Sequence, residues 1–503
     1  MSLVSNTFIL FVAATILVYY LVPGKLQWIV LLVFSYLYYI AGGVQYLLFL
    51  LFSTAVTYGG ALLISRLRAD GKEKTAKRIL LLALLLNLGM LGVLKYSDFV
   101  IENINAVLHL GWKEFRFLLP LGISFYTFQS TGYLLDVWWK RTEPERNPGK
   151  YALFVSFFPQ LLQGPIGKFS RLEPQLCTPH KPTGRNLCRG FERILWGYFK
   201  KMIIADWAVV FVDAVFDDPG KLSGISIFAV IMYSIQLYAD FSGGIDVVIG
   251  IAEMMGITLD ENFTQPYLAT SLADFWHRWH ISLGNWMKDY VFYPLSLSRW
   301  MGKFGKWAKQ TFGKKTGRGL PICISNILVF LVVGIWHGAA WKYVVYGLYN
   351  GIIIGVSGML AGAYRSWKKA LHINSKAAWY HVFMVLRTLV IVNIYRFFDR
   401  ADTVRGAWTL LVDSFTHWNP SLIMTIPAGR GGTAFTPYAL LIIACGCIVL
   451  FIVSILKEKG WDIRERIAAL PLPVSAAIYF CLLLSIGLFG STAAARGFIY
   501  AQF

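Results

Sequence analysis

The stretch "YALLIIACGCIVLFIVSIL", residues 438 to 456, decides the fold class, because it runs for 19 residues without a charged side chain. A helix of that length crosses a hydrocarbon core about 30 Å thick. Similar apolar runs recur along the chain at 8–22, 46–64, 79–94, 225–237, 331–354 and 474–490. We therefore predict an all-α, polytopic membrane protein with roughly 11 transmembrane helices, plus re-entrant and interfacial helices.

The composition supports a membrane protein and argues against a nucleic-acid-binding domain. Of the 503 residues, 56% are hydrophobic and 15% are charged, and the net charge is +20. The positive charge lies in short connectors between apolar runs, at residues 66–78, 299–318 and 365–376. This pattern is typical of cytoplasmic loops, and such loops also attract acidic donors or anionic lipid head groups. We expect a location in the cell membrane, contact with membrane lipid and no nucleic-acid partner.

Sequence signals for several other classes are missing. The six cysteines have no metal-ligand or redox spacing, so we expect no metal site. No glycine-rich nucleotide-binding motif is present. Because no hydrophilic stretch is long enough for a soluble domain, we predict one integral-membrane domain over 1–503. Its expected parts are N-terminal spans over 1–114, a core with broken helices over 115–350 and C-terminal spans over 351–503.

Proline, glycine and polar residues interrupt the apolar runs of the middle part. In "FFPQLLQGPIGKFS" (157–170), Pro159 and Pro165 disfavour a continuous spanning helix, so we predict a re-entrant or interfacial element. In "IQLYADFSGGIDVVIG" (235–250), Ser242 and the two glycines after it predict a break in the helix. Broken backbone at membrane depth is stable only where protein or a water-filled cavity satisfies its polar groups. The middle part is therefore expected to line a cavity.

Two of the eight histidines lie in segments suited to chemistry. His337 follows nine uncharged residues, which favours the neutral imidazole that a general base requires. His280 lies in "FWHRWHISLGNWMKDYVFYPL" (275–295), where helical spacing would place it on one face with Trp276 and His277. Each segment also has a plainer interpretation. His337 could bridge two helices, and segment 275–295 could be an amphipathic interfacial helix.

Acidic residues inside apolar runs raise a different possibility. Asp240 and Asp246 flank the sequence "FSGG", and Asp136 lies in another run. Intramembrane carboxylates serve as proton relays, so a proton-coupled transporter or flippase that uses Asp240 and Asp246 stays open. The structural interpretation is that these residues cap the amides of a broken helix. A scaffold for a polysaccharide export complex is a further alternative.

Segment 275–295, followed about 55 residues later by "GIWHGAAWKYVVYGLYNG" (334–351), resembles the membrane-bound O-acyltransferase (MBOAT) family. The resemblance is closer to the bacterial branch that contains the alginate O-acetyltransferase membrane subunit and the D-alanyl transfer protein of teichoic acid synthesis. It extends over nearly the whole chain, through segments 119–137, 154–176, 236–257, 261–276, 395–408 and 498–503. "LLQGPIGKFS" and the terminal "FIYAQF" favour the alginate-acetylation members.

This resemblance implies a ring of helices around a central funnel or tunnel, with the core over 115–350 as the catalytic part. It also implies an acyltransferase without a bound cofactor. The acyl group, expected to be acetyl, would pass from a cytoplasmic thioester, acetyl-coenzyme A or an acyl-carrier protein, to a hydroxyl of an extracytoplasmic polysaccharide or of a partner. A separate SGNH-type acyltransferase is the implied partner. D-alanyl transfer to teichoic acid from a carrier protein is the alternative within the family.

The family's functional residues can be placed on this sequence by their motifs. By this match, His337 is catalytic and His280 is functionally important. The family usually has arginine where this chain has His277, so an exchange of roles between His277 and His280 stays open. We expect His337 to act as general base, and His280 to orient the acceptor or to stabilise an oxyanion together with Asn285 or Trp276. The other residues expected to line the site are Arg278, Trp279, Ser282, Asp289, Trp336, Gln129, Gln163 and Asp240, and those expected to bind the donor are Lys303, Lys306, Lys314 and Lys315.

Overall fold

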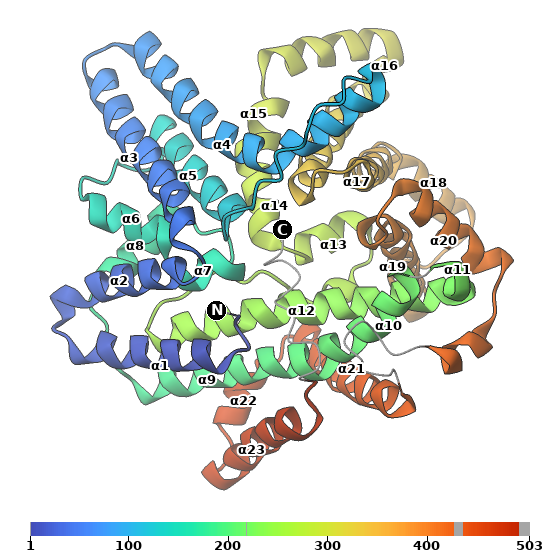
Figure 1. Ribbon diagram of the computed structural model, residues 1–503. Coiled ribbons are helices and arrows are strands. Elements are labelled where there is room, and N and C mark those ends of the chain that lie inside the picture. The colour runs from blue at the N-terminus through green and yellow to red at the C-terminus, as the bar shows by residue number, and fades with distance from the viewer. Residues whose placement is uncertain (1, 218, 427–435, 492–503) are drawn as a thin grey trace.

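The computed structural model describes residues 2–217, 219–426 and 436–491 of the chain (Figure 1). Across these residues the secondary structure is helical, and the β-bridge between Phe263 and Trp279 belongs to no strand. The predicted all-α class is therefore confirmed. The terminal "FIYAQF" (498–503) lies outside the described residues.

Helix boundaries follow local sequence signals. For example, α1 (Asn6–Leu21) begins after Ser5, whose side chain accepts a hydrogen bond from the backbone N–H of Phe8. The N-terminal part continues with α2 (Gln27–Ile40), α3 (Leu47–Ala69) and α4 (Glu73–Leu108). The middle part contains α5 (Ile123–Trp138), α6 (Pro148–Ser156), α7 (Phe158–Gln163), α8 (Phe169–Cys177), α9 (Gly184–Tyr198), the π-helix η3 (Phe199–Ala205), α10 (Asp206–Asp217), α11 (Pro219–Leu222), α12 (Ser226–Met254), α13 (Leu272–Arg278), α14 (Ile281–Met287), the π-helix η6 (Lys288–Phe292) and α15 (Tyr293–Ser296). The C-terminal part contains α16 (Arg299–His337), α17 (Trp341–Met359), α18 (Ala361–Ala370), α19 (Ala378–Arg400), α20 (Val404–Thr416), α21 (Pro437–Glu458), α22 (Ile463–Ala468) and α23 (Leu472–Phe489). Short 3₁₀ turns join some of these helices: η1 (Gly24–Leu26), η2 (Val44–Tyr46), η4 (Ser223–Ile225), η5 (Pro266–Leu268) and η7 (Pro420–Thr425).

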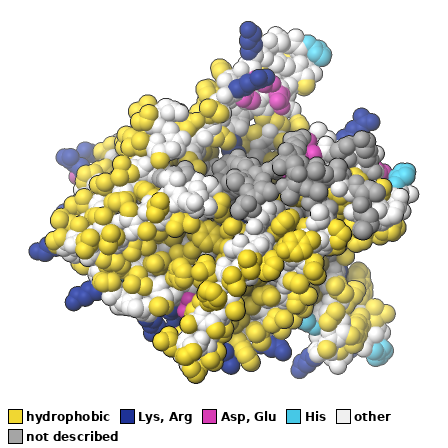
Figure 2. All heavy atoms as spheres, turned by 60° about the horizontal axis from the view of Figure 1, so that its bottom comes forward, with side chains coloured by type: hydrophobic (Ala, Val, Ile, Leu, Met, Phe, Trp, Pro, Cys, Tyr) yellow, Lys and Arg dark blue, Asp and Glu magenta, His cyan; other side chains and the backbone are white. Residues whose placement is uncertain are grey.

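Seven of the described helices are long and apolar enough to cross a membrane, namely α3, α4, α12, α16, α19, α21 and α23. The pair α17 and α18, bent by 61° at its junction, forms an eighth candidate. Hydrophobic side chains cover most of the described surface in Figure 2, and Lys and Arg side chains lie mainly along its margins. The chain is therefore a multi-pass membrane protein. The expected count of about 11 spans is not confirmed, and two of the described apolar helices, α1 and α2, are shorter than the others that could span.

The interruption predicted around Pro159 is present. α6 ends at Ser156, and Phe157 takes non-helical dihedrals (φ −51°, ψ 105°) before the short helix α7. After Gln163 the chain continues without helical structure as far as Lys168. No helix of spanning length therefore forms over 157–170, as the two prolines require.

The break predicted near Ser242 is wrong, because α12 runs without interruption through that sequence. The small residues serve close packing instead. A methyl group added to Gly197 of α9 would lie 2.5 Å from the carbonyl oxygen of Gly243 in α12, so no side chain fits there. Glycine lets the two backbones touch, as it does at other tight helix crossings in membranes.

The two carboxylates that flank this contact are held in ion pairs and do not cap a broken helix. Asp240 accepts from Lys201 Nζ at 2.5 Å, and Asp246 accepts from Lys200 Nζ at 2.6 Å. Both lysines come from η3 and are almost fully buried. Lys201 also pairs with Asp206 at 2.8 Å. These carboxylates are thus buried together with cations, as buried charges must be.

α16 and α17 form a tight antiparallel hairpin at the end of α16. A methyl group added to Gly334 would lie 2.2 Å from the carbonyl oxygen of Tyr343, so the helices touch through their backbones. The small residue Gly334, three residues before His337, thus lets α17 approach the end of α16 closely. α16 also changes direction at Gly313, whose φ of 79° is left-handed. Its first part is therefore a separate basic helix that precedes the apolar part.

Helices α13 and α14 lie near the middle of the view in Figure 1, and longer helices surround them. Both helices are only seven residues long. They carry the conspicuous segment 275–295, so the arrangement places the histidine-bearing loop inside the protein.

Candidate active site

The histidine-bearing segment is not one helix, contrary to the spacing argument. α13 ends at Arg278, Trp279 is extended, and His280 takes left-handed dihedrals (φ 48°, ψ 52°) before α14 begins. A residue with a β-carbon in this conformation costs of order 1 to 3 kcal/mol, so the surroundings must hold it. Trp276, His277 and His280 therefore do not share a helical face. Within α13, Arg278 pairs with Asp274 four residues earlier, and its Nε donates to Asp274 Oδ1 at 2.8 Å.

An extended segment holds the strained residue in place. The backbone N–H of Ile281 donates to the carbonyl of Asn262 at 3.0 Å, and the N–H of Thr264 donates to the carbonyl of Arg278 at 2.9 Å. The side chain of Asn262 is completely buried, and its Oδ1 lies 3.3 Å from His280 Nδ1. We name residues 261–264 the bracing segment.

The structure brings His280 and His337 to the same indole ring. The ring of Trp336 lies 5.8 Å from the His280 ring and 5.1 Å from the His337 ring, measured between centroids. All three side chains are at most 6% exposed. The two histidines thus come from segments far apart in sequence and form one buried cluster.

The end of α16, which carries His337, is fixed by α4. Lys95 Nζ donates to the carbonyl of Trp336 at 2.5 Å, and the hydroxyl of Tyr96 donates to the carbonyl of Ile335 at 2.7 Å. The last carbonyls of a helix have no partner within the helix, and a cation is favoured there. On the other side, the hydroxyl of Tyr346 from α17 lies 3.5 Å from His337 Nε2.

The two tryptophans near the histidines differ in how their N–H groups are used. Trp276 Nε1 donates to Asn350 Oδ1 at 3.0 Å, so this N–H is engaged and does not point to a substrate. Trp336 Nε1 is buried, and among the described residues it has no hydrogen-bond partner. A buried donor without a partner costs free energy, which suits a group that binds substrate.

Trp279 helps to anchor the histidine loop. Its ring lies 4.8 Å from the guanidinium carbon of Arg396 in α19. Arg396 is 2% exposed and pairs with Asp399 at 2.7 Å. A cation held against an indole face is attracted to it, so Arg396 of α19 helps to fix Trp279 and the histidine-bearing loop that contains it.

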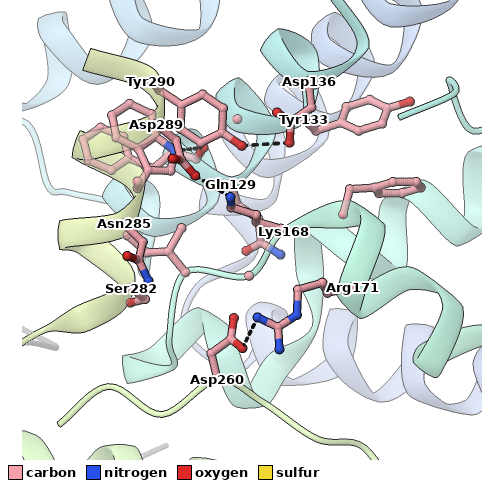
Figure 3. A pocket seen from close by; sticks show the side chains of 16 residues that line it. Gln129, Tyr133, Asp136, Lys168, Arg171, Asp260, Ser282, Asn285, Asp289 and Tyr290 are labelled. Carbon is pink, nitrogen blue, oxygen red and sulfur yellow. Dashed lines mark hydrogen bonds and ion pairs between the residues drawn. The ribbon is translucent and has the colours of Figure 1, made fainter. Parts of the chain in front are cut away.

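Two cavities reach α14 from different sides. The first has a volume of about 290 Å³ and is mainly apolar; its lining includes Trp276, His277, His280, Val333 and Ile354. The second has a volume of about 230 Å³ and is polar (Figure 3). Asn285 lines both cavities. His277 lies on the exposed side of α13, whereas His280 is buried.

Figure 3 shows the polar cavity between α5, the segment around Lys168, and α14 with η6. Three interactions cross it: Lys168 with Asp289 (2.5 Å), Arg171 with Asp260 (2.7 Å) and the Tyr290 hydroxyl with Asp136 (2.8 Å). Ser282 and Gln129 also line this cavity.

Some of the expected site residues lie away from the histidines. Lys303, Lys306, Lys314 and Lys315 are exposed on the first half of α16. At about 1.5 Å per residue, the helix from Lys315 to His337 measures about 33 Å, so Lys314 and Lys315 do not touch the reacting atoms. Lys303 and Lys306 lie before the turn at Gly313, where Gly305 packs beside Pro321, and Pro321 is itself about 24 Å of helix away from His337. Asp240 is held by Lys201 in the α12 packing described above. Gln163 is fully buried at the end of α7 and lines neither cavity.

Sequence reasoning missed several residues that build the site, namely Asn262, Lys95, Tyr346, Asn350 and Arg396. Lys95 had a usable signal, because a cation that directly follows the apolar run 79–94 is costly to bury and marks a specific contact. Asn262 had a weaker one, since it lies in the non-helical sequence "ENFTQPY" just before the histidines. Among the described residues, no three His, Cys, Asp or Glu side chains are grouped to hold a metal ion.

Comparison with known proteins decides the family. Residues 145–395 match the profile described as MBOAT, the membrane-bound O-acyltransferase family. The chain is 32% identical over 424 residues to the probable alginate O-acetylase AlgI of Pseudomonas aeruginosa. The aligned region covers 83% of this chain and 76% of that protein. The chain belongs to the membrane-bound O-acyltransferase family. It is accordingly an acyltransferase, and the paired histidines lie in the stretch that the MBOAT profile matches.

Two further MBOAT relatives show how the similarity is distributed. The peptidoglycan O-acetyltransferase of Helicobacter pylori is 34% identical over 361 residues, covering 66% of this chain and 63% of that protein. The teichoic acid D-alanyltransferase of Bacillus subtilis is 30% identical over 243 residues, covering 46% of this chain and 58% of that protein. The similarity to the alginate O-acetylase thus extends over more of the chain.

Proposed function

We propose that the protein transfers an acetyl group from a cytoplasmic thioester to a hydroxyl group on the opposite side of the cell membrane. The acceptor is a polysaccharide or an SGNH-type partner protein that passes the group on. The observation that carries this proposal is the contact of both buried histidines with one indole, Trp336. Relatives named for O-acetylation of alginate and peptidoglycan support acetyl as the group and a polysaccharide as the acceptor.

In this mechanism His337 acts as the general base. It removes the proton from the acceptor hydroxyl while the hydroxyl oxygen attacks the thioester carbonyl. The tetrahedral intermediate then breaks its carbon–sulfur bond, and the thiolate takes the proton back from His337. The step gives an oxygen ester and a free thiol, and no net proton is released. His280 orients the acceptor hydroxyl at the same indole.

The proposed oxyanion donor is Trp336 and not Trp276, because the Trp276 N–H is engaged with Asn350. The unsatisfied N–H of Trp336 lies on the ring that both histidines contact. It would stabilise the negative charge that develops on the carbonyl oxygen.

Removing this N–H should slow the chemical step. Trp336→Phe keeps an aromatic ring and deletes the donor, and we expect kcat to fall by about 10²- to 10³-fold, as for loss of one oxyanion donor. The control is Trp276→Phe, which deletes an N–H that is already bound within the protein. A kcat for Trp336→Phe equal to that of the control would remove Trp336 from the mechanism.

The donor is proposed to reach the histidines through the apolar cavity that touches His280. The positive charge of segments 66–78, 299–318 and 365–376 supports a cytoplasmic location for these segments, on the side where acetyl-coenzyme A or an acyl-carrier protein is available. Lys303, Lys306, Lys314 and Lys315 would attract such an acidic donor to that face without contacting the thioester.

Neutralising these four lysines together to glutamine should therefore raise the KM for the donor several-fold, leave kcat unchanged, and flatten the dependence of kcat/KM on salt concentration. Steady-state kinetics at several salt concentrations measure this. The matched control is neutralisation of Lys369 and Lys376 in the basic segment 365–376, which are also exposed. If the two variants behave alike, the lysines of α16 only set membrane topology.

The direct test of the proposed function uses purified protein with labelled acetyl-coenzyme A, labelled acetyl-carrier protein or labelled D-alanyl-carrier protein. A polysaccharide acceptor is added with and without the SGNH-type partner. We expect ester-linked label from an acetyl donor. Label from the D-alanyl carrier alone would favour teichoic acid D-alanylation, the alternative within the MBOAT family. The transporter hypothesis predicts instead that Asp240→Asn abolishes uptake while His337→Ala has little effect.

A further inference from the structure

Asn262 is the buried side chain that touches the proposed catalytic machinery from the bracing segment. It is 0% exposed, and its Oδ1 has two neighbours with hydrogen-bonding nitrogens. The backbone N–H of Ser282 donates to Oδ1 at 2.9 Å, and His280 Nδ1 lies 3.3 Å from the same atom. The amide thus lies between the imidazole and the first turn of α14.

The hydrogen-bond network determines which amide atom faces the imidazole. A backbone N–H can only donate, so the atom that faces Ser282 must be the oxygen of Asn262 and not its NH₂ group. An amide oxygen can only accept. The His280 nitrogen that shares this oxygen, Nδ1, must therefore carry a hydrogen. Because burial lowers the pKa of His280 well below its usual value, the ring is neutral and Nε2 carries no hydrogen.

Backbone and ion-pair contacts around Asn262 fix its position relative to His280. Its carbonyl accepts from the N–H of Ile281, and the preceding residue, Glu261, pairs with Arg193 of α9 at 2.6 Å. His280 is held in its left-handed conformation between these contacts. The amide and the ring are thus fixed relative to each other by three separate elements: the bracing segment, α9 and the start of α14.

We propose that Asn262 is a positioning residue that holds His280 in the Nδ1–H tautomer, so that Nε2 accepts a hydrogen bond from the acceptor hydroxyl. This inference rests on the proposed function for the identity of the bound hydroxyl, but the tautomer is a property of the protein alone. It separates the two roles that the sequence left open for His280. A neutral ring whose Nε2 carries no hydrogen can accept from a hydroxyl and so orient it, but it cannot donate to an oxyanion.

The experiment compares two variants of nearly equal size. Asn262→Asp keeps an oxygen that accepts from Ser282 and His280, whereas Asn262→Leu keeps the shape and removes the acceptor. ¹⁵N NMR of the histidine rings reports the tautomer without any substrate. The His280 signals are assigned as those missing from the spectrum of His280→Gln. We expect the Nδ1–H form in the parent and in Asn262→Asp, and its loss in Asn262→Leu.

Kinetics of the same variants provide the second readout. Asn262→Leu should lower kcat by about 10²-fold, as expected when a reacting hydroxyl is misplaced, with a small change in KM, and Asn262→Asp should restore most of the lost kcat. The control is Asn87→Leu. Asn87 is equally buried and bonds to Ser53 and Thr131 in the α3–α4–α5 packing, so it reports the cost of losing a buried amide elsewhere.

An Nε2–H tautomer in the parent, or an unchanged His280 signal in Asn262→Leu, would overturn the proposal. A Leu variant that loses no more kcat than Asn87→Leu would also overturn it. Because the spectra need no donor or acceptor, failure to detect acyl transfer would count against the proposed function and leave the tautomer assignment to be judged by NMR.

Discussion

Replacing His337 with alanine is expected to lower the rate of acyl transfer by about 10²- to 10⁴-fold, the range that a positioned general base contributes. The imidazole lies at the buried end of α16, between the rings of Trp336 and Tyr346. Lys95 and Tyr96 hold that helix end through its carbonyls, which do not depend on the histidine side chain. The variant should therefore insert and fold, and the loss should appear in kcat.

The matched control for this prediction is His381→Ala. His381 is exposed on α19, outside the cavities that reach α14. Initial rates of ester formation, normalised to the amount of monodisperse protein, measure both variants. His337→Ala acting at a rate close to that of the control would show that this residue is not the base, and His280 would become the next candidate.

The second large effect is expected on stability. Lys201→Met should lower the free energy of unfolding by about 3 to 5 kcal/mol, because it removes the cation from between two buried carboxylates. Lys201 contacts Asp240 and Asp206 at 2.5 and 2.8 Å, and all three side chains are at most 6% exposed. Methionine has a similar length, so the change acts mainly through charge.

Thermal unfolding in detergent or lipid nanodiscs measures this effect. Lys303→Met, a substitution of the same type at an exposed position, serves as the control and should unfold close to the parent temperature. If Lys201→Met were as stable as the control, the ion pairs of η3 and α12 would not hold the helices together. That result would favour the proton-relay hypothesis for Asp240 over a purely structural role.

The sequence predicted the features that depend on composition and local pattern. Long uncharged runs such as 438–456 correspond to helices of spanning length, here α21. The prolines at 159 and 165 correctly predicted the absence of a continuous helix. The two histidine segments were recognised, and the structure brings their side chains to one indole.

Features that depend on tertiary contacts were not predictable in this way. The sequence "FSGG" reads as a helix break, but Gly197 of α9 packs against it and α12 stays intact. The spacing of Trp276 and His280 suggests one helix, yet hydrogen bonds from a segment some 15 to 20 residues earlier hold His280 in a left-handed conformation. In both places a distant backbone overrides local preference.

The most direct test of the central claim uses protein reconstituted into liposomes that enclose the polysaccharide and the SGNH-type partner. A protease site inserted in 299–318 reports which molecules expose their basic face outward. Labelled acetyl donor is added outside only. We predict ester-linked label on the enclosed polysaccharide in proportion to outward-facing molecules, and none with His337→Ala. Equal labelling by His337→Ala, or labelling that is independent of orientation, would contradict acyl transfer across the membrane at the paired histidines.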